Sequence, residues 1–371
     1  MQNLAIVYGG DSSERDISII TAIQLMNNIN KSKYKFYPII QINYNFYLVD
    51  DWKNIDQYSP FEEEKHTRVS FLSDGLYKLG KHRYKKLTNI DCVVLCNHGG
   101  MGENGTLQGY FSSLNLCYTS PSVCASAIGM NKYLSKMLFK SLGCNVVDGV
   151  LYEQGKSLDA VVKLLGFPLI VKPNCQGSSI GINTAHDMTE LREAIKVATQ
   201  YDDQIIIEKA LENFVELNMA LIRQDDKIIV SSPEQPLSWQ EFLTFEDKYI
   251  STGKMSGGGR VYPAKVEIEL LDEIKRMATT IYSALDMSGI VRMDFLTAHD
   301  RAYINEINTI PGSMAYYLFK EQALDYEDLI DIVVAQSIKD SEHRKVAQFQ
   351  SNVLSDFHTY SNACKKPTKI L

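Results

Sequence analysis

Two short segments near the C-terminal end of the chain most constrain its fold. Segments 289–297 and 302–309 read GIVRMDFLT and AYINEINT, and a short polar stretch separates them. Both have the β-branched and aromatic composition of strands, so the pattern predicts a β-hairpin centred near Asp300. Side chains alternate between the two faces of a strand, so the register of this hairpin determines which polar residues meet.

In that register Asp294 lies opposite Glu306, and Arg292 lies opposite Asn308. The result is a patch of three oxygen ligands beside one guanidinium group. Oxygen-only ligands suit Mg²⁺, which commonly accompanies nucleotide phosphates. A polar strand face turned to water is the alternative. Opposed carboxylates without a cation would repel one another, so the pattern favours a metal site.

Length and composition limit the classes of function. The chain has 371 residues, a net charge of -7 and 45% hydrophobic residues, which is typical of a globular protein of two or three domains. The acidic balance argues against a general nucleic-acid-binding protein. The start of the chain reads as a strand rather than a signal peptide, and no run of 18 apolar residues occurs, so we expect a cytoplasmic protein without membrane insertion. The seven cysteines are then expected to be reduced thiols, most of them buried.

Segment composition predicts the organisation of the chain. Residues 1–128 alternate strand-like and helix-like segments, which predicts an α/β unit with a largely parallel sheet. Residues 129–217 and 218–340 read as two further subdomains, and the tail 341–371 carries no readable motif. An amphipathic helix is expected over 129–143. Its apolar stripe, flanked by Lys132 and Lys136, consists of Met130, Leu134, Met137, Leu138 and Leu142.

Two glycine-rich loops follow strands in the first unit. The motif GGDSSER at 9–15 opens a helix, where backbone amides favour anions. Taken alone it is better explained by a capping pair of Asp11 and Glu14, although a glutamate there can also receive an ammonium group. The motif HGGMGENGT at 98–106 allows close backbone approach, and for His98 a structural and a functional role are equally supported.

A third loop has the composition of a phosphate site. Lys172 ends a predicted strand, and PNCQGSSIG follows it, so backbone amides, hydroxyls and an ammonium group can surround an anion. An ordinary turn is the alternative. Further on, Glu208 ends an apolar strand whose backbone could meet an adenine edge, and Glu216 could bind ribose hydroxyls. The long segment 238–262 is typical of a lid or binding loop, in which an aromatic side chain could cover a base and a lysine could meet phosphate.

In this order, the motifs resemble those of the ATP-grasp superfamily, and more narrowly the D-alanine–D-alanine ligases. The resemblance rests on GGDSSER, HGGMGENGT, KPNCQGSSIG, EKAL, FLTFEDKY, RMD and NEINTIPG, and runs from about residue 3 to 338. It implies a mixed α/β and α+β architecture: an ATP-grasp fold preceded by a parallel-sheet α/β domain. It also implies a homodimer that joins two D-alanines at the expense of ATP for peptidoglycan precursors.

The resemblance also implies roles for individual residues. The catalytic set would be Glu14, Ser178, Tyr249, Arg292 and the Gly312 backbone. Substrate contacts would come from His98 for the first D-alanine, and from Tyr317 and Leu318 for the second. ATP would be held by Lys132, Lys172, Ser179, Glu208, Lys209, Leu211, Glu216, Phe242 and Lys248. Two Mg²⁺ ions, for which Mn²⁺ could substitute, would be bound by Asp294, Glu306 and Asn308.

The chain departs from the family pattern at three positions. Tyr317 stands where a shorter hydroxyl residue is usual, so D-serine, D-lactate or another amino acid remains an alternative second substrate. Gln176 replaces a usual carboxylate and Cys175 a common basic residue, and neither change removes a reacting group. Tyr249 favours D-alanine over D-lactate. A non-catalytic ATP-binding module would be expected to lack a metal ligand or a phosphate lysine, and a Rossmann oxidoreductase would need a true GxGxxG motif; the sequence supports neither.

Overall fold

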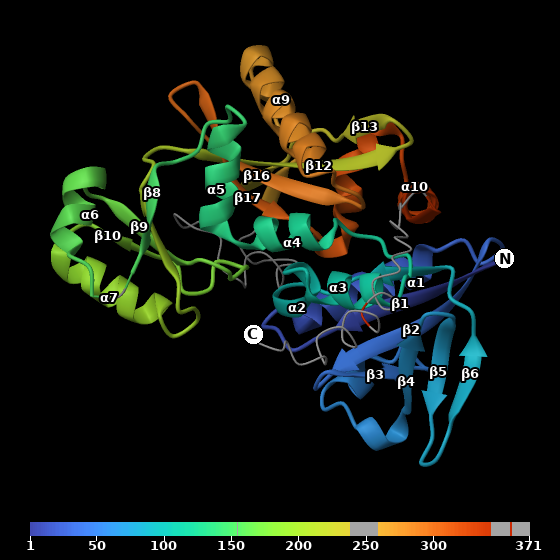
Figure 1. The fold of residues 1–371 in the computed structure, drawn as a ribbon. Coiled ribbons are helices and arrows are strands. Elements are labelled where there is room, and N and C mark those ends of the chain that lie inside the picture. Colours follow the sequence, from blue (N-terminus) through green and yellow to red (C-terminus); the bar gives the residue numbers. More distant parts are fainter. Residues whose placement is uncertain (154, 238–258, 343–356, 358–371) are drawn as a thin grey trace, which may run out of the picture.

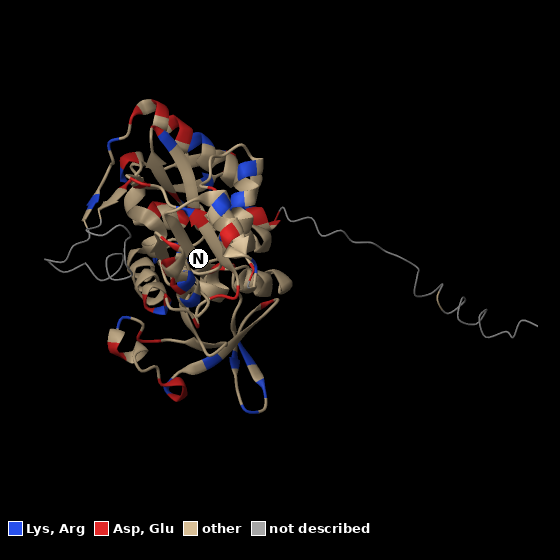
Figure 2. Ribbon diagram, turned by 90° about the vertical axis from the view of Figure 1, so that its left-hand side faces the viewer, with Lys and Arg blue, Asp and Glu red and all other residues tan. Residues whose placement is uncertain are grey.

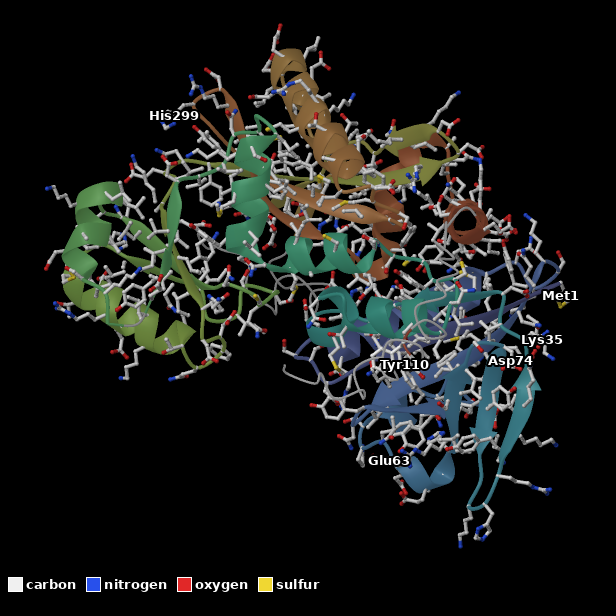
Figure 3. All side chains as sticks on the ribbon, in the orientation of Figure 1. Met1, Lys35, Glu63, Asp74, Tyr110 and His299 are labelled. Carbon is white, nitrogen blue, oxygen red and sulfur yellow. The ribbon has the colours of Figure 1, made fainter. Side chains whose placement is uncertain are left out.

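The computed structural model describes residues 1–153, 155–237, 259–342 and 357. Three sheets of four or more strands form the body, and Figure 1 shows α2, α3 and α4 lying between the N-terminal sheet and the C-terminal sheet. His299 lies far from Glu63 and Asp74, which belong to the N-terminal unit (Figure 3). None of the helices within the described ranges is long and apolar enough to cross a membrane.

The N-terminal sheet has seven strands in the order β6-β5-β4-β3-β2-β1-β7. The parallel centre that the sequence predicts is formed by β1 (Gln2–Gly9) with β2 (Tyr34–Ile42) and β7 (Cys92–Leu95). An antiparallel extension adds β3 (Asn45–Leu48), β4 (Thr67–Leu72), β5 (Gly75–Leu79) and β6 (Tyr84–Thr88). Helices α1 (Arg15–Asn28), α2 (Gly100–Glu103) and α3 (Thr106–Ser113) complete this unit, with short 3₁₀ turns at Ile55–Tyr58 and Glu63–Lys65.

The central unit is a four-stranded antiparallel sheet in the order β10-β9-β11-β8. Its strands are β8 (Gly149–Tyr152), β9 (Leu169–Pro173), β10 (Asn183–Ala185) and β11 (Ile205–Lys209). Helices α6 (Leu158–Leu165) and α7 (Met188–Ala198) pack their apolar sides against it. The apolar run of β9 and β11 is buried, as expected for strands covered by helices.

The C-terminal sheet has the order β13-β12-β16-β17 and is also antiparallel. It contains β12 (Val215–Gln224), β13 (Lys227–Val230), β16 (Val291–Ala298) and β17 (Arg301–Asn308). Helix α9 (Ile268–Ala284), the 3₁₀ segment η3 (Gly312–Gln322) and helix α10 (Tyr326–Glu342) pack on this sheet. Near the end of the long predicted loop, β15 (Gly259–Val261) pairs with β14 (Gln235–Leu237).

The predicted hairpin is confirmed, and a bulge explains its register. Arg292 pairs with Asn308 and Asp294 with Glu306. The turn is formed by His299 and Asp300, at φ of 51° and 57°, the left-handed conformation of a two-residue hairpin turn. Without a bulge, such a turn would centre the hairpin half a residue before the predicted centre at Asp300. The extra residue, Asn305, is inserted on β17 and restores the pairing of the two carboxylates.

The expected single helix over 129–143 is wrong in both extent and orientation. Helix α4 (Val123–Met130) ends, and Asn131 then starts α5 (Lys132–Ser141) by accepting the backbone N–H of Leu134. The predicted apolar stripe does not form the core face, since Leu134 and Met137 are 49% and 55% exposed. The buried side of α5 instead carries Lys132 and Lys136.

The cysteine expectation holds for the described residues. Cys92, Cys96, Cys117 and Cys144 are buried free thiols, Cys175 is half-buried and Cys124 is exposed. Burial raises the pKa of the Cys96 thiol, which keeps it protonated. Cys364 lies outside the described ranges.

Candidate nucleotide and metal site

Two buried lysines surround one buried glutamate where α5 meets the central sheet. The Glu208 carboxylate on β11 lies 2.8 Å from Lys172 Nζ of β9 and 3.0 Å from Lys136 Nζ of α5. Burial by itself would raise the pKa of Glu208, but the two ammonium groups outweigh it and lower that pKa to about 2. This explains why α5 turns its lysines inward: their partners are inside the protein.

A pocket opens beside these lysines, between the central sheet and the β16–β17 hairpin. Several of the segments expected to hold a nucleotide or its metal contribute to its lining, which consists of Lys132, Lys172, Gln176, Ser179, Ile182, Phe214, Glu216, Leu296, Asn305 and Glu306. Lys132 Nζ donates to the Gln176 carbonyl and lies 3.6 Å from Glu306. The pocket therefore combines ammonium groups, carboxylates and apolar walls, as a magnesium nucleotide requires.

Of the predicted oxygen ligands, Glu306 lines this pocket, and Asp294 is paired with it across the hairpin. Arg292 donates from Nε and an Nη to both oxygens of Asp294 at 2.7 Å, and Asn308 donates to Asp294 at 2.9 Å. Within the described ranges no three His, Cys, Asp or Glu side chains form a metal cluster. The donor set of two carboxylates and an amide oxygen still fits Mg²⁺ provided that phosphate or water oxygens complete its coordination.

Two glycine-containing loops approach the Glu14 carboxylate closely. Ser178 donates a hydrogen bond to the Glu14 carboxylate, and both side chains are buried. A Cβ atom on Gly99 would lie 2.6 Å from Glu14 Oε2, and one on Gly177 would lie 3.0 Å from it. These positions need glycine because the backbone approaches the carboxylate so closely.

The expected capping pair at the start of α1 is wrong. Glu14 occupies the N-cap position without a capping hydrogen bond from its side chain. The Asp11 carboxylate instead accepts the backbone N–H groups of Asn43 and Tyr44, in the turn after β2. The Glu14 carboxylate is therefore directed to the loop 174–181, where Ser178 contacts it, and remains available to a ligand ammonium group.

His98 is buried with both ring nitrogens in contact with partners. Nδ1 lies 2.7 Å from the Ile310 carbonyl and Nε2 lies 2.9 Å from the Thr21 hydroxyl. Burial lowers the pKa of His98 to about 4, so the ring is neutral at pH 7. Next to it, burial and the nearby Glu14 raise the pKa of Glu103, which accepts three hydrogen bonds.

Tyr317 belongs to a polar cluster near Arg292. Its hydroxyl donates to Glu234 Oε1 at 2.9 Å, and the Arg260 guanidinium lies 4.3 Å from its ring centroid and 3.4 Å from Glu234. Burial and the Glu234 carboxylate raise the pKa of Tyr317, so the phenol is protonated. The Leu318 side chain is wholly buried in the core, and its carbonyl accepts the Tyr262 hydroxyl.

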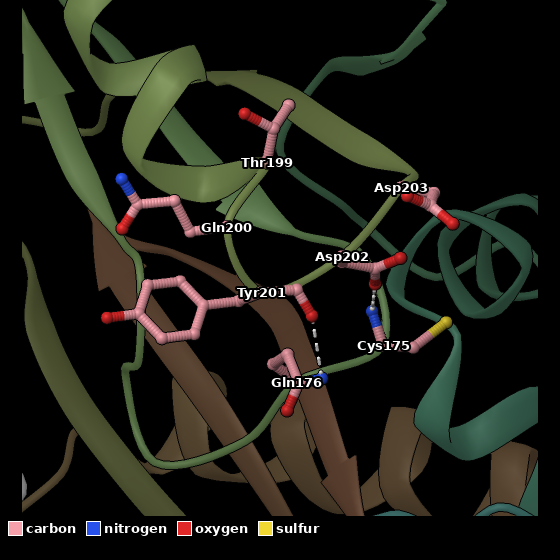
Figure 4. Close-up of a pocket in the computed structure, with 7 residues that line it drawn as sticks. All are labelled: Cys175, Gln176, Thr199, Gln200, Tyr201, Asp202 and Asp203. Atoms are coloured by element: carbon pink, nitrogen blue, oxygen red, sulfur yellow. Dashed lines mark hydrogen bonds between the residues drawn. The ribbon is translucent and has the colours of Figure 1, made fainter.

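The loop 174–181, which carries Ser178 and Ser179, is anchored near the end of α7. Gln176 Nε2 donates to the Tyr201 carbonyl, and the Cys175 backbone N–H donates to Asp202, both at a small hollow beside the end of α7 (Figure 4). The residues that depart from the family pattern, Cys175 and Gln176, thus contribute to loop position. Ser178 and Ser179 both have positive φ, at 52° and 58°, which turns the loop towards Glu14.

Several predicted site residues lie apart from the pocket or outside the described ranges. Lys209 is exposed and Leu211 half-buried at the end of β11. Phe242, Lys248 and Tyr249 fall outside the described ranges. Charged residues of both signs are interspersed over most of the ribbon (Figure 2).

Sequence reasoning missed three polar residues of this region. Lys136 was recognised only as a residue beside the apolar stripe, although its i,i+4 spacing from Lys132 puts both on one face. Asn305 accepts a hydrogen bond from Lys172 because the β-bulge re-aims it into the pocket. Glu103 is the last residue of the short helix α2, in a motif that was interpreted through its glycines, and its acidic side chain was the available signal.

Family models match both ends of this architecture. One described as D-ala D-ala ligase N-terminus matches residues 3–121, and one described as D-ala D-ala ligase C-terminus matches residues 138–335. D-alanine--D-alanine ligases with similar sequences include one from Thermosipho melanesiensis, 32% identical over 95% of this chain and 98% of the relative. Another, from a Sulfurovum species, is 34% identical over 88% of this chain and 91% of the relative.

Solved structures agree. A Helicobacter pylori D-alanine-D-alanine ligase has a TM-score of 0.74 at 29% identity, covering 91% of this chain and 98% of that one. The VanG D-Ala:D-Ser ligase from Enterococcus faecalis has a TM-score of 0.78 at 26% identity, covering 91% and 99%. Family models for both ends, and relatives of nearly equal length, show that this chain belongs to the D-alanine–D-alanine ligase family and has its ATP-grasp fold.

Proposed function

We propose that this protein is an ATP-dependent ligase that joins two D-alanines for peptidoglycan precursor synthesis in the cytoplasm. The observation that carries the proposal is one pocket in which Lys132 and Lys172 lie near Glu306 of the β16–β17 hairpin. This pocket offers positive charge for phosphates and oxygen ligands for their cation. The named relatives support the reaction, and a Bacillus anthracis D-alanine--D-alanine ligase of the same fold has been crystallised with ATP.

The proposed nucleotide site divides its contacts between two sheets. Lys132, Lys172 and Ser179 bind phosphate oxygens, and Glu216 binds ribose hydroxyls. The strand end at Glu208, Lys209 and Leu211 meets the adenine edge. From the loop 238–262, Phe242 covers the base and Lys248 contacts phosphate. Asp294, Glu306 and Asn308 would hold two Mg²⁺ ions, which would neutralise phosphate charge. Loss of either carboxylate would leave these phosphates without their main counter-charge.

The chain's own residues then organise two steps. Glu14, tied to Ser178 and through it to Tyr249, receives the ammonium of the first D-alanine, while His98 lies beside its carboxylate. That carboxylate attacks the γ-phosphorus of ATP, which gives an acyl phosphate and ADP. The amine of the second D-alanine attacks the acyl carbon, and phosphate leaves. Arg292 and the Gly312 N–H stabilise the developing oxyanion, and closure of the loop excludes water.

The polar cluster around Tyr317 motivates the main alternative within this family. A tyrosine hydroxyl reaches further than the usual shorter hydroxyl residue, and the VanG relative is named as a D-Ala:D-Ser ligase. D-serine or D-lactate could therefore replace the second D-alanine. The mechanism up to the acyl phosphate would be unchanged, because only the acceptor differs.

The test is product mass spectrometry with ATP, Mg²⁺ and competing D-alanine, D-serine and D-lactate. We expect D-alanyl-D-alanine as the dominant product, and no product after magnesium is chelated. Asp294→Ala and Glu306→Ala should lower turnover by at least about a hundredfold while the variants remain folded. A mixed dipeptide or ester would move the specificity to the alternative. Absence of ADP in every mixture would overturn the enzymatic proposal.

The domain organisation and assembly are part of the same proposal. Residues 1–128 form the substrate domain, 129–217 the central ATP-grasp subdomain and 218–340 the C-terminal one, with 341–371 as a tail. We propose a homodimer that binds small-molecule substrates and neither nucleic acid nor membrane. Light scattering of the purified protein would measure the assembly directly, with about 84 kDa expected for two copies of the 42.0 kDa chain.

A further inference from the structure

The segment 310–313, which contains the oxyanion-facing Gly312, leads into a strained turn. Ser313, Met314 and Ala315 have φ values of 52°, 54° and 46°, so three consecutive non-glycine residues are left-handed. This conformation costs on the order of 1 kcal/mol for each such residue. Strain of this kind persists where surrounding contacts fix the backbone, and it gathers at functional sites.

The N-terminal unit fixes the first end of this segment. Glu103 on α2 accepts the backbone N–H of Ile310 at 3.0 Å and the Thr309 hydroxyl at 3.3 Å. Its other oxygen accepts the Gly99 N–H at 2.8 Å. The carbonyl of Ile310 meets His98 Nδ1 at 2.7 Å. Both polar groups of the Ile310 backbone are therefore bound by the single loop 98–103.

The second end is fixed by α1. The backbone N–H of Ser313 donates to Thr21 Oγ1 at 3.0 Å, and Thr21 lies 2.9 Å from His98 Nε2. The Ile310 carbonyl can only accept, which assigns the hydrogen of the neutral His98 to Nδ1. Nε2 then accepts the Thr21 hydroxyl hydrogen, and the Thr21 oxygen accepts from Ser313. Each donor in this chain of contacts has one acceptor.

We propose that Thr21, His98 and Glu103 act together as an oxyanion clamp, positioning the Gly312 N–H for the second step of the reaction. The inference rests on the proposed function. Gly312 lies between the two fixed residues, Ile310 and Ser313, so a shift at either end moves its N–H. All three side chains are buried, with exposed fractions of 0–9%, so the clamp is shielded from competing water.

The clamp acts on one step only. When the amine attacks the acyl phosphate, a C–N bond forms, the acyl oxygen becomes an oxyanion, and the amine loses a proton. Collapse of this intermediate breaks the C–O bond to phosphate, which departs as inorganic phosphate. The earlier transfer from ATP to the carboxylate develops its charge on phosphorus-bound oxygens, which the lysine pocket holds. A loosened clamp should therefore slow amide formation and spare phosphoryl transfer.

The test compares Thr21→Val with Thr21→Ser in the full-length enzyme. Valine keeps the shape but removes the hydroxyl, whereas serine retains it. Dipeptide turnover of Thr21→Val should fall about 10- to 100-fold, the effect of a small displacement in an active site, and serine should restore most of it. Positional isotope exchange in ¹⁸O-labelled ATP reports reversible formation of the acyl phosphate of the first D-alanine. The rate of this exchange should stay within about threefold of wild type.

Glu103→Gln provides a second variant if Thr21→Val is poorly folded. Glutamine keeps the acceptor for Ile310 but turns an NH₂ group towards the Gly99 N–H. The variant should therefore also lose dipeptide turnover while isotope exchange is retained. Full dipeptide turnover in a folded variant of either residue would overturn the clamp, as would an equal loss of isotope exchange and turnover. Absence of exchange and dipeptide in wild type would instead overturn the proposed function.

Discussion

At the scale of single residues, Tyr317 changes what the acceptor pocket offers to a ligand. Its hydroxyl is already committed to Glu234, and its ring supports the Arg260 guanidinium. The half-exposed Arg260 and the half-buried Arg292 thus both present cations near Tyr317. A carboxylate-bearing acceptor would meet these cations, so the tyrosine contributes to binding by holding two neighbours in place.

We expect Tyr317→Phe to weaken acceptor binding and leave ATP binding unchanged. Removal of the hydroxyl takes one donor from a buried carboxylate, a change of about 1.5–3 kcal/mol, so the KM for the second D-alanine should rise about tenfold or more. Steady-state kinetics with each substrate varied in turn would measure this. The neighbouring Tyr316→Phe, whose ring packs on Tyr326, serves as the control. An unchanged acceptor KM in Tyr317→Phe would contradict this role.

Residue pairing was predictable from sequence where strand alternation decides it. The pairing of Asp294 with Glu306 could be predicted because side chains alternate along a strand and the position of the turn was readable from the sequence. Asn305 could not be found in this way, because a bulge breaks the alternation and no local residue type requires it there. The contact of Ser178 with Glu14 joins residues 164 positions apart, and only the family resemblance pointed to it.

At the scale of elements, buried charge rather than the apolar stripe determines which face of α5 points into the protein. The helix is amphipathic as predicted, but its inner face carries lysines that meet Glu208 and Glu306. Hydrophobic periodicity assumes that the core is apolar, an assumption that fails where a helix lines a nucleotide pocket. The helix boundary at Asn131 was missed because α4 and α5 together read as one periodic segment.

We expect Lys136→Met to destabilise the protein, since it removes one of the two cations beside a buried carboxylate. Breaking a buried ion pair typically costs about 3 kcal/mol or more in the free energy of unfolding, to be measured in urea. Lys140→Met on the same helix should change it by less than about 1 kcal/mol, because Lys140 and its partner Asp148 are each 72% exposed.

The double variant Lys136→Met with Glu208→Gln tests the cause of that loss. Neutralising Glu208 removes the uncompensated charge, so the double variant should be more stable than Lys136→Met alone. If the double variant is no more stable, lost packing of the lysine stem, rather than charge, determines the effect.

At the scale of the whole molecule, the first and last units share one core. Leu4 and Leu25 of the N-terminal unit pack in the same buried cluster as Leu329 and Val333 of α10. Helix α10 thereby brings the end of the described body back onto the first sheet. The alternating pattern of the N-terminal unit predicted the parallel centre of that sheet. The antiparallel extension was not predicted, because short half-exposed strands such as β6 carry a weak periodic signal.

His98 links these units through contacts to α1 and to the segment after β17, so its protonation affects global stability. Its pKa is about 4 in the folded chain, against an ordinary value of 6.5. Between these values the unfolded chain binds a proton that the folded chain does not, so stability falls as pH falls. The linkage amounts to about 3 kcal/mol across the interval. Glu103 acts in the opposite sense: burial and Glu14 raise its pKa, so its contribution is fully present below pH 4.5 and declines as pH rises.

We therefore expect His98→Gln to lose less stability than wild type on acidification. The free energy of unfolding, measured in urea at half-unit steps from pH 7.5 to 4.5, should fall less steeply for the variant because its side chain takes up no proton on unfolding. Only the slope is compared, since loss of the contacts to Thr21 and Ile310 lowers stability at every pH. His186→Gln is the control, because the His186 side chain is 64% exposed and remains in contact with water in the folded chain. An acid-side slope in His98→Gln equal to that of wild type would show that folding does not lower the pKa of His98, and would contradict a buried ring that stays neutral on acidification.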